Sequence, residues 1–377
     1  MTSLNVDVAI MGGGIMGCTA ALQLRKDGLT VAVLEKGMCG AQASGINAGG
    51  VRQQGRALCD LPLARRAIGI WYKMEALLGE DIEFRPIGHI RLAFNDKEIA
   101  VLEDYARAAR DYGLNLELKS GETIRRECGW LSSKVAGASF SPECGHANPR
   151  LVTPAFARAA RRSGAQICEF TEVKGAQWTG SSFEIDAGPL VVKSRHLVNC
   201  TGAWAEEVSG WFGERVTVKL RSPNLMVTEP VPVFITRSVA VVPGIPYFRQ
   251  VDRGNVVIGG GPGWGDLATE RSRPVTDTTL NAYRKLMDIV PGMRGLTIIR
   301  SWSGLEGDTG DRNPVISTST TTPNLVHAFG FSGHGFQLGP AVGEVIAELV
   351  QHGQSTTPIQ PFHIQRFLTP RPAAATA

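Results

Sequence analysis

The hydrophobic pattern at the start of the chain predicts a strand, a helix and a second strand. The segment Val6–Met11 is almost wholly apolar, which is typical of a strand buried within a parallel sheet. The segment Ile15–Lys26 is predicted to be a helix that ends before Gly28, and Thr30–Leu34 is predicted to be the second strand. The chain is therefore expected to begin with an α/β unit.

Glycines lie at the turn between this first strand and the helix, in the pattern Gly-x-Gly-x-x-Gly. Gly12 allows a sharp turn, Gly14 leaves room for a pyrophosphate beside the backbone, and Gly17 lets the helix pack close to the sheet. The N-terminus of the helix would point its unpaired N–H groups at that phosphate. Glu35, 21 residues after Gly14, has the spacing of a carboxylate that binds a ribose diol, and it disfavours NADP. The unit favours a dinucleotide site, for FAD or NAD, over a glycine turn without a ligand.

Small side chains dominate the segment after Glu35, KGMCGAQASGINAGGVRQQGR, which has no hydrophobic period. One interpretation is a flexible surface loop. Its position directly after the ribose-binding acid favours a loop that wraps a cofactor. Arg52 and Arg56 would then be cations close to the cofactor or to a substrate anion.

The rest of the chain divides into α/β stretches and β-rich stretches. We predict an α/β plus α+β fold, in which a Rossmann-like dinucleotide-binding domain is interleaved with a β-rich substrate-binding domain of antiparallel sheet and helices. The first domain is expected to comprise residues 1–83, 146–215 and 299–377, and the second to comprise residues 84–145 and 216–298.

Several elements of this division are predicted individually. Helices are expected at Leu58–Leu78, at Thr153–Ser163 with its first residue as the N-cap, and from about Pro340 to Gln351. Leu296–Trp302 is expected to be a strand that returns the chain to the first domain. Asn324–Ala328 is expected to be a strand that leads into a second glycine-rich turn, GFSGHGF.

Composition narrows the class of protein. The chain has 377 residues, of which 43% are hydrophobic and 20% charged, and its net charge is +4 without a basic block, so no nucleic-acid partner is expected. Its seven cysteines form no C-x-x-C pair, which excludes the usual zinc motifs and fits a reducing cytoplasm. We expect no signal peptide, because the first strand leaves no room for one. No apolar run is long enough for a transmembrane segment.

Five motifs, taken in chain order, together resemble one family: GGGIMG with Glu35 and Lys36; ASGINAGGVRQQ; TEVKG; NCTGAWA; and W-S-G with DTGDRNPVI and GFSGHGF. The chain resembles the FAD-dependent amine and amino-acid oxidoreductases of the D-amino-acid oxidase superfamily. Its greatest likeness is to the β subunits of heteromeric proline, hydroxyproline and opine dehydrogenases and of sarcosine oxidases. The resemblance implies an FAD bound along the sheet and roofed by the β-rich domain.

The resemblance also implies which residues hold FAD. At the pyrophosphate and adenosine end they are Gly12, Gly14, Ile15, Met16, Glu35, Lys36 and Val173. The loop toward the flavin supplies Ala43, Ser44, Asn47, Ala48, Gly49, Gly50 and Val51. Thr201 and Gly202 lie beside the cofactor, and Gly304, Gly330, Gly333, His334, Gly335, Phe336 and Gln337 line the isoalloxazine. The helix N-terminus after GFSGHGF would stabilise a reduced, anionic flavin. His334 would add to that field, make a structural hydrogen bond, or do both.

Substrate orientation is expected from a cation and hydroxyls, because the flavin itself carries the chemistry. We predict Arg52, Tyr247, Arg249, His334 and Gln337 as the residues that act on the substrate. The family often places a tyrosine and an arginine near the hairpin of Tyr247 and Arg249. The alternative for Tyr247 is a half-buried strand aromatic. No catalytic triad, carboxylate pair or metal site is expected.

Departures from the family pattern bear on the reaction. Gln337 stands where single-chain sarcosine oxidases have a carboxylate-binding lysine, and no lysine occurs between Lys219 and Lys285 to activate oxygen. No cysteine follows Cys200 to bond the flavin, and Pro149 replaces the histidine that bonds FMN in heteromeric sarcosine oxidases. These departures imply a dehydrogenase with non-covalent FAD, and they leave an FMN at a subunit interface open.

The expected reaction is oxidation of the C–N bond of a secondary amino acid, such as proline, hydroxyproline, an opine or sarcosine, by hydride transfer to flavin N5. The imine product is then hydrolysed, and the electrons leave through a partner subunit in a hetero-oligomer. The expected location is the cytoplasm, including the inner membrane surface through partners. Alternatives are a glycine or D-amino-acid type oxidase that produces hydrogen peroxide, a non-catalytic electron-relay or scaffold subunit, and an NAD-dependent reductase.

Overall fold

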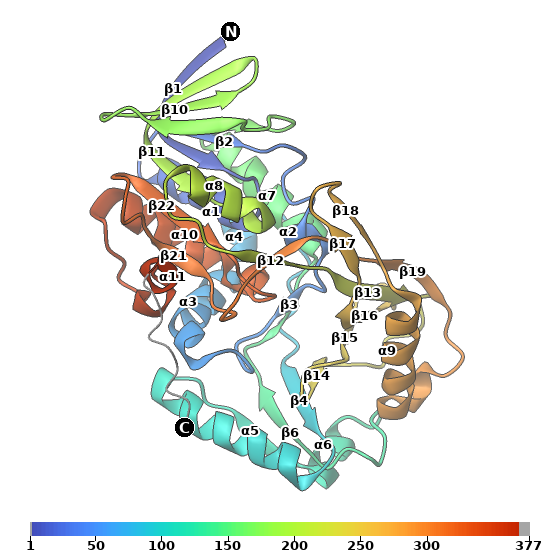
Figure 1. Cartoon of the computed structure of the whole chain (residues 1–377). Helices are drawn as coiled ribbons and strands as arrows, with labels where there is room; N and C mark the ends of the chain where they lie inside the picture. The colour runs from blue at the N-terminus through green and yellow to red at the C-terminus, as the bar shows by residue number, and fades with distance from the viewer. Residues whose placement is uncertain (1, 369–377) are drawn as a thin grey trace, which may run out of the picture.

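The computed structural model describes residues 2–368, and its strands form two large sheets that lie side by side (Figure 1). Each of these sheets has eight strands. The first contains β1 (Thr2–Met11), β2 (Val31–Leu34), β8 (Gln166–Cys168), β9 (Gly175–Trp178), β10 (Phe183–Ala187), β11 (Leu190–Asn199), β21 (Val315–Thr318) and β22 (Leu325–Phe329). The second contains β4 (His89–Ala93), β5 (Glu117–Ser120), β6 (Gly137–Ser141), β13 (Pro223–Thr228), β14 (Ser238–Val241), β15 (Tyr247–Gln250), β16 (Val256–Pro262) and β19 (Ile298–Trp302).

The first sheet has a parallel centre. Its order is β21-β22-β11-β1-β2-β8, and β1 pairs in parallel with both β11 and β2. The register aligns Met11 with Leu34 and with Asn199, so these three strands end at one edge. Chain segments that leave the carboxyl ends of parallel strands form the usual ligand crevice of such sheets. The register therefore brings Gly12, Glu35 and Thr201 together.

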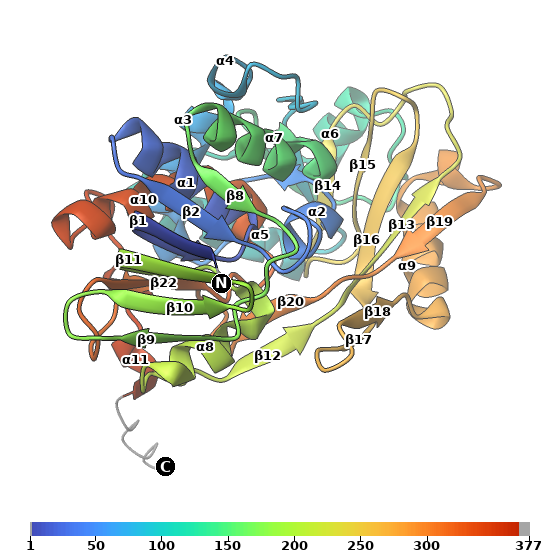
Figure 2. The same ribbon diagram turned by 90° about the horizontal axis from the view of Figure 1, so that it is seen from above.

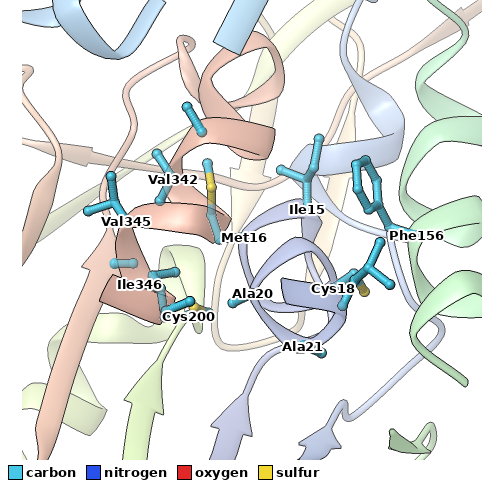
Figure 3. Packing of buried hydrophobic residues seen from close by; sticks show 14 of the residues in the cluster. Ile15, Met16, Cys18, Ala20, Ala21, Phe156, Cys200, Val342, Val345 and Ile346 are labelled. Carbon is cyan, nitrogen blue, oxygen red and sulfur yellow. The ribbon is translucent and has the colours of Figure 1, made fainter. Parts of the chain in front are cut away.

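Helices cover one face of this sheet, and a hairpin with a short helix covers the other. The helical face carries α1 (Ile15–Lys26), α3 (Leu61–Trp71), α4 (Met74–Leu78), α7 (Pro149–Arg162) and α10 (Gly335–His352). In the middle of this layer Met16 of α1 lies against Val342 of α10, while Phe156 of α7 packs from the other side (Figure 3). The opposite face is covered by β9, β10 and α8 (Ala205–Trp211), which pack on Ala9 and Met11.

The second sheet is antiparallel except where β14 pairs in parallel with β4. One of its faces packs on α6 (Gly121–Glu127) and α9 (Thr276–Ile289), and α9 lies beside β13, β16 and β19 in Figure 2. Strand alternation puts Ile90 and Leu92 in that core, both 0% exposed, and turns His89 and Arg91 to the other face. That second face looks onto the space between the two sheets.

The remaining helices and strands lie outside the two large sheets. They are α2 (Ala43–Ile46), α5 (Asp96–Ala109), α11 (Gln365–Leu368) and the two-stranded pairs β3 (Gly50–Val51) with β7 (Gly145–His146), β12 (Val218–Arg221) with β20 (Glu306–Thr309), and β17 (Trp264–Asp266) with β18 (Arg271–Arg273). Within residues 2–368 no helix is long and apolar enough to cross a membrane.

The fold class is confirmed, and four predicted elements are wrong in detail. Leu58–Leu78 is a short 3-10 turn followed by two helices, α3 and α4, rather than one helix. β19 pairs with β13 in the second sheet, so Leu296–Trp302 does not return the chain to the first sheet. Both α7 and α10 begin earlier than predicted, at Pro149 and Gly335, and each carries a proline inside the helix.

Candidate active site

A cavity of about 910 Å³ runs from the carboxyl edge of the first sheet to the open face of the second. A volume of this size suits a large ligand. Its lining includes twenty-three of the predicted site residues: Gly12, Gly14, Ile15, Met16, Glu35, Lys36, Ala43, Ser44, Asn47, Ala48, Gly50, Arg52, Val173, Thr201, Gly202, Tyr247, Arg249, Gly330, Gly333, His334, Gly335, Phe336 and Gln337. The exceptions are Gly49, Val51 and Gly304, which lie behind the lining.

The first glycine turn has the close contacts that its sequence predicted. Gly12 has a φ of +101°, and a Cβ there would lie 2.4 Å from the carbonyl oxygen of Cys200. A Cβ on Gly17 would lie 2.0 Å from the carbonyl oxygen of Gly12. Such distances exclude any larger residue unless the backbone moves. The turn thus packs against the strand end at Thr201 and places the N-terminus of α1 at the cavity.

Glu35 is held in position by the backbone of the same turn. Its Oε2 accepts a hydrogen bond from the Gly13 N–H at 2.7 Å, and its Oε1 accepts one from the Gly37 N–H at 2.8 Å. Lys36 also lines the cavity, but its ammonium forms an ion pair with Glu270 and lies 3.4 Å above the ring of Trp204. The Glu35 carboxylate is thus fixed at the edge of the cavity, whereas the Lys36 ammonium is already paired.

The loop after β2 is braced from behind by residues predicted to line the cofactor. Asn47 Oδ1 accepts from the Gly49 N–H at 2.8 Å, and a Cβ on Gly49 would lie 2.1 Å from the Ala147 carbonyl oxygen. A Cβ on Gly304 would lie 1.8 Å from Ile46 Cδ1. Gly49, Val51 and Gly304 are not among the residues that line the cavity, and Gly49 and Gly304 pack closely against the chain behind the loop. Their predicted contact with the cofactor stays a prediction.

Arg249 has the same supporting role. Its Nε donates to the Ala48 carbonyl at 2.5 Å, and its Nη2 donates to the Ala147 carbonyl at 3.2 Å. Burial lowers its pKa to about 10, which still leaves the guanidinium charged at neutral pH. The side chain reaches the cavity wall, but these donors position the loop.

The second glycine turn leads into α10. Trp71 Nε1 donates to the Gln337 carbonyl at 2.8 Å, and Gln337 Nε2 donates to the Ala64 carbonyl at 2.9 Å. Gln337 Oε1 is buried and has no hydrogen-bond partner among residues 2–368. The N-caps of α1 and α10, Gly14 and His334, make no side-chain cap bond within the described chain. Two helix N-termini and an unpaired acceptor at one cavity fit a ligand with phosphates and hydrogen-bond donors, as FAD has.

Of the two roles predicted for His334, the surroundings favour the structural hydrogen bond. Its Nδ1 lies 3.1 Å from Asp60 Oδ2, yet burial, together with the charges of Arg56 and Arg52, lowers its pKa to about 4. We favour the neutral ring at neutral pH, because two buried cations oppose the single carboxylate. His334 therefore makes a structural hydrogen bond and adds no positive charge to the α10 terminus.

Groups of opposite sign face the cavity near β15. Arg52, which lines the cavity, donates from Nη1 to the carbonyls of Gln54 and Gly55, at 2.7 and 3.2 Å. The Tyr247 hydroxyl has no hydrogen-bond partner within residues 2–368. Burial and the neighbouring Glu306 carboxylate raise the pKa of Tyr247 to about 12, against the charges of Arg221 and Arg52. Tyr247 thus lies near enough to a carboxylate and to two guanidinium groups for all three to affect its pKa.

Sequence reasoning missed Glu306 and Arg91. Glu306 accepts a hydrogen bond from the Gly333 N–H, and burial raises its pKa although Arg221 opposes the shift. Glu306 lies in β20, and the strand that pairs with β20, β12, is distant in the chain, so no local pattern marks this residue. Arg91 carried a readable signal, because alternation in His89–Ala93 puts it on the face opposite Ile90 and Leu92.

Comparison with known proteins identifies the family. Residues 7–349 match the model of the FAD dependent oxidoreductase family. The chain is similar to a glycine oxidase of Geobacillus kaustophilus, at 28% identity over 96% of this chain and 97% of that protein. It is also similar to the sarcosine oxidase subunit beta of Rhodobacter capsulatus, at 27% identity over 96% and 88% of the two chains.

A solved structure shares the whole architecture. The crystal structure of L-proline dehydrogenase from P. horikoshii superposes with a TM-score of 0.90 and 28% identity, over 98% of this chain and 99% of that one. The suspected resemblance to the D-amino-acid oxidase superfamily is confirmed, and FAD is the cofactor. Because the family model covers both glycine turns, the intervening loop and the second sheet, this chain belongs to the family of FAD dependent oxidoreductases.

Proposed function

We propose that this enzyme oxidises the C–N bond of a secondary amino acid and that it works as a dehydrogenase. The observation that supports this is the pairing of Arg52 with Tyr247 and Glu306 at one cavity. A cation and a hydroxyl suit a carboxylate, and a nearby acid suits an amine. Proline and sarcosine, the compounds in two of the relatives' names, are both secondary amino acids.

The residues of the chain bind the substrate and handle its proton. When bound, FAD supplies the acceptor for a hydride from the carbon next to the nitrogen. Arg52 holds the substrate carboxylate, and the Tyr247 hydroxyl donates to the same group. Glu306 takes a proton from the substrate ammonium, and burial makes its carboxylate a stronger base. The amine has then lost a hydride and its proton, and the resulting imine takes up water to give a carbonyl compound and an amine.

Cavity chemistry also favours a dehydrogenase over an oxidase. Among the described residues that line the cavity, the only lysine is Lys36, and its ammonium pairs with Glu270. We therefore propose an acceptor other than oxygen, reached through partner subunits, with a cytoplasmic location. Similarity to a sarcosine oxidase subunit beta supports a hetero-oligomer.

The proposed FAD is bound non-covalently, and an FMN at a subunit interface stays a hypothesis. The proposed domain division assigns the flavin to the first sheet and the substrate to the second.

An anaerobic titration of the FAD-loaded protein tests the proposal. The panel holds both enantiomers of proline and hydroxyproline, sarcosine, an opine and glycine, and the readout is loss of the visible flavin absorbance. We expect secondary amino acids to bleach the flavin, and Glu306→Gln to slow bleaching by about tenfold or more, the usual size of a lost proton acceptor. Glu75→Gln, an exposed change on α4, serves as the control. Absence of bleaching by every compound would overturn the proposal.

The alternative is an oxidase that produces hydrogen peroxide, and the similarity to a glycine oxidase favours it. The same preparation separates the two functions when air is admitted after bleaching. A dehydrogenase leaves the flavin reduced for minutes and forms little peroxide. Rapid return of the absorbance, with peroxide equal to the substrate consumed and glycine as the preferred substrate, would establish the alternative.

A further inference from the structure

One corner of the cavity gathers three arginines, here called the arginine corner: Arg52 and Arg56 from the loop after β3, and Arg91 from β4. Arg91 lies along Gly55, where an added Cβ would be 3.1 Å from its Cδ and Nη1 atoms. Burial, together with the charge of Arg52, lowers the pKa of Arg56 to about 9. Burial and then the same charge also lower the pKa of Arg91. The guanidinium groups therefore lie close enough to repel one another.

Hydrogen bonds within the protein leave much of this corner free. Arg52 gives only Nη1 to backbone carbonyls. Arg56 gives Nε to the Arg52 carbonyl at 2.9 Å and Nη1 to the His334 carbonyl at 3.3 Å. Arg91 has no hydrogen bond or ion pair with any residue in the described part of the chain. All of its donors are available to a ligand.

Nearby acids do not balance these charges. Asp60 lies close enough to Arg56 to raise its pKa, but its Oδ2 contacts His334 and the structure pairs it with no arginine among residues 2–368. Elsewhere, Arg66 forms ion pairs with Glu344 and Glu348, and Arg85 with Asp81 and Asp252. Cations in a protein interior are costly unless they are paired, so the arginine corner fits an anion from outside the chain.

We propose that the substrate is a dicarboxylic secondary amine, in which two carboxylate-bearing carbons are joined through the nitrogen. This inference rests on the proposed function. Arg52 binds one carboxylate, next to Tyr247, and Arg91 with Arg56 binds the second. A monocarboxylate would neutralise one of the cations and leave Arg91 unpaired. Charge-assisted, two-pronged contacts of arginine with a second carboxylate add both affinity and selectivity.

A matched pair of substrates tests the inference on the unmodified holoenzyme. Sarcosine and iminodiacetate share the secondary amine and one acetate, and iminodiacetate has a second carboxylate in place of hydrogen. We expect kcat/KM for iminodiacetate to exceed that for sarcosine by about tenfold or more, because a charged hydrogen-bonded pair is gained. Equal values, or a preference for sarcosine, would overturn the inference while leaving the proposed function intact.

Variants assign the effect to Arg91. Arg91→Gln should lower kcat/KM for iminodiacetate by about tenfold more than for sarcosine, and Arg91→Lys should recover part of the difference. Arg300→Gln, on the outer strand β19 and exposed, is the control with the same change of charge. An equal loss for both substrates, or loss of FAD from Arg91→Gln, would show that Arg91 supports the fold or the cofactor instead.

Binding without turnover distinguishes the two proposals. Glutarate and butyrate differ by one carboxylate, and each is titrated into the holoenzyme while the flavin spectrum is followed. Tighter binding of glutarate supports the arginine corner even if no amine is oxidised, in which case the proposed function alone fails. Equal binding of the two acids contradicts the inference whatever the variants do.

Discussion

At the scale of single residues, the site depends on glycines that have no side chain and on hydrogen bonds that orient the Glu35 carboxylate. Because Gly12 has no Cβ, the turn can pack against the Cys200 carbonyl, and because Gly17 has none, the helix can pack against the Gly12 carbonyl. Glu35 is oriented by two backbone N–H groups, whereas Arg249, predicted to meet substrate, donates to the loop at Ala48. The short-range spacing of these residues thus predicts the shape of the turn, whereas the role of Arg249 depends on which acceptors its donors already meet.

Gly17→Ala tests the close contact at the turn. Because the new Cβ would lie 2.0 Å from the Gly12 carbonyl oxygen, the turn must shift. We expect a loss of about 1–3 kcal/mol in the free energy of unfolding, measured by denaturant titration, and weaker retention of FAD on gel filtration. Gly69→Ala is the matched control, since nothing lies within 4 Å of its Cβ on the exposed side of α3. That control should gain about 0.5–1 kcal/mol. Equal stability of both variants would show that the contact is not tight.

At the scale of elements, helix starts were harder to predict than helix positions. The sequence predicts a helix that starts at Pro154 and another that starts at Pro340, because proline is common in the first turn. Both lie inside a helix that begins five residues earlier, at Pro149 and Gly335. The true N-cap of α7 is Asn148, whose side chain accepts from the Arg150 N–H at 3.1 Å. The earlier start of α10 matters for function, because it places the helix N-terminus within the glycine turn itself.

Trp71→Phe tests how α3 holds this start of α10. Trp71 is 0% exposed, and its Nε1 donates to the Gln337 carbonyl. Removing the donor leaves a buried acceptor unpaired, so we expect a loss of about 1–3 kcal/mol in unfolding free energy. The visible flavin spectrum should also shift, because Gln337 lines the cavity. Tyr72→Phe removes an exposed hydrogen bond to the Glu143 carbonyl and should change stability by less than about 0.5 kcal/mol. If the two variants unfold alike, the bond contributes nothing to the helix junction.

At the scale of the whole molecule, two sheets enclose one cavity. Two buried histidines, His146 and His334, lie in segments close to this cavity. His146, in the strand pair beside the cofactor loop, has its pKa lowered to about 2 by burial and by Arg249 and Arg85. His334, at the start of α10, has its pKa lowered to about 4 for similar reasons. Both rings are neutral in the folded protein at neutral pH.

These histidines predict acid sensitivity of the whole fold. A histidine in the unfolded chain has a pKa of about 6.5, so below that pH the unfolded state binds protons that the folded state rejects. Stability therefore falls as pH drops from about 6.5 toward 4, by up to about 1.4 kcal/mol per pH unit for each ring. We expect Tm to decline over this range, measured with saturating FAD, and His146→Gln to decline less steeply. His352→Gln, exposed at the end of α10, is the control. Parallel curves for all three proteins would contradict the assignment to His146.

The sequence alone determined the features that depend on neighbours in the chain. The glycine turn, its helix and Glu35 lie within thirty-odd residues of one another, so their spacing contains the geometry of a dinucleotide site. Motifs over the remaining chain were specific enough to indicate the family and the fold class, which the comparisons confirmed. Tertiary structure decided which side chains remain free. Arg91 and Glu306 face the cavity because two sheets bring residues more than two hundred positions apart to one space, and Arg249 is engaged because Ala48 reaches it there. Long-range contacts of this kind leave no local period in the sequence, so only the folded chain shows where the uncompensated charges lie.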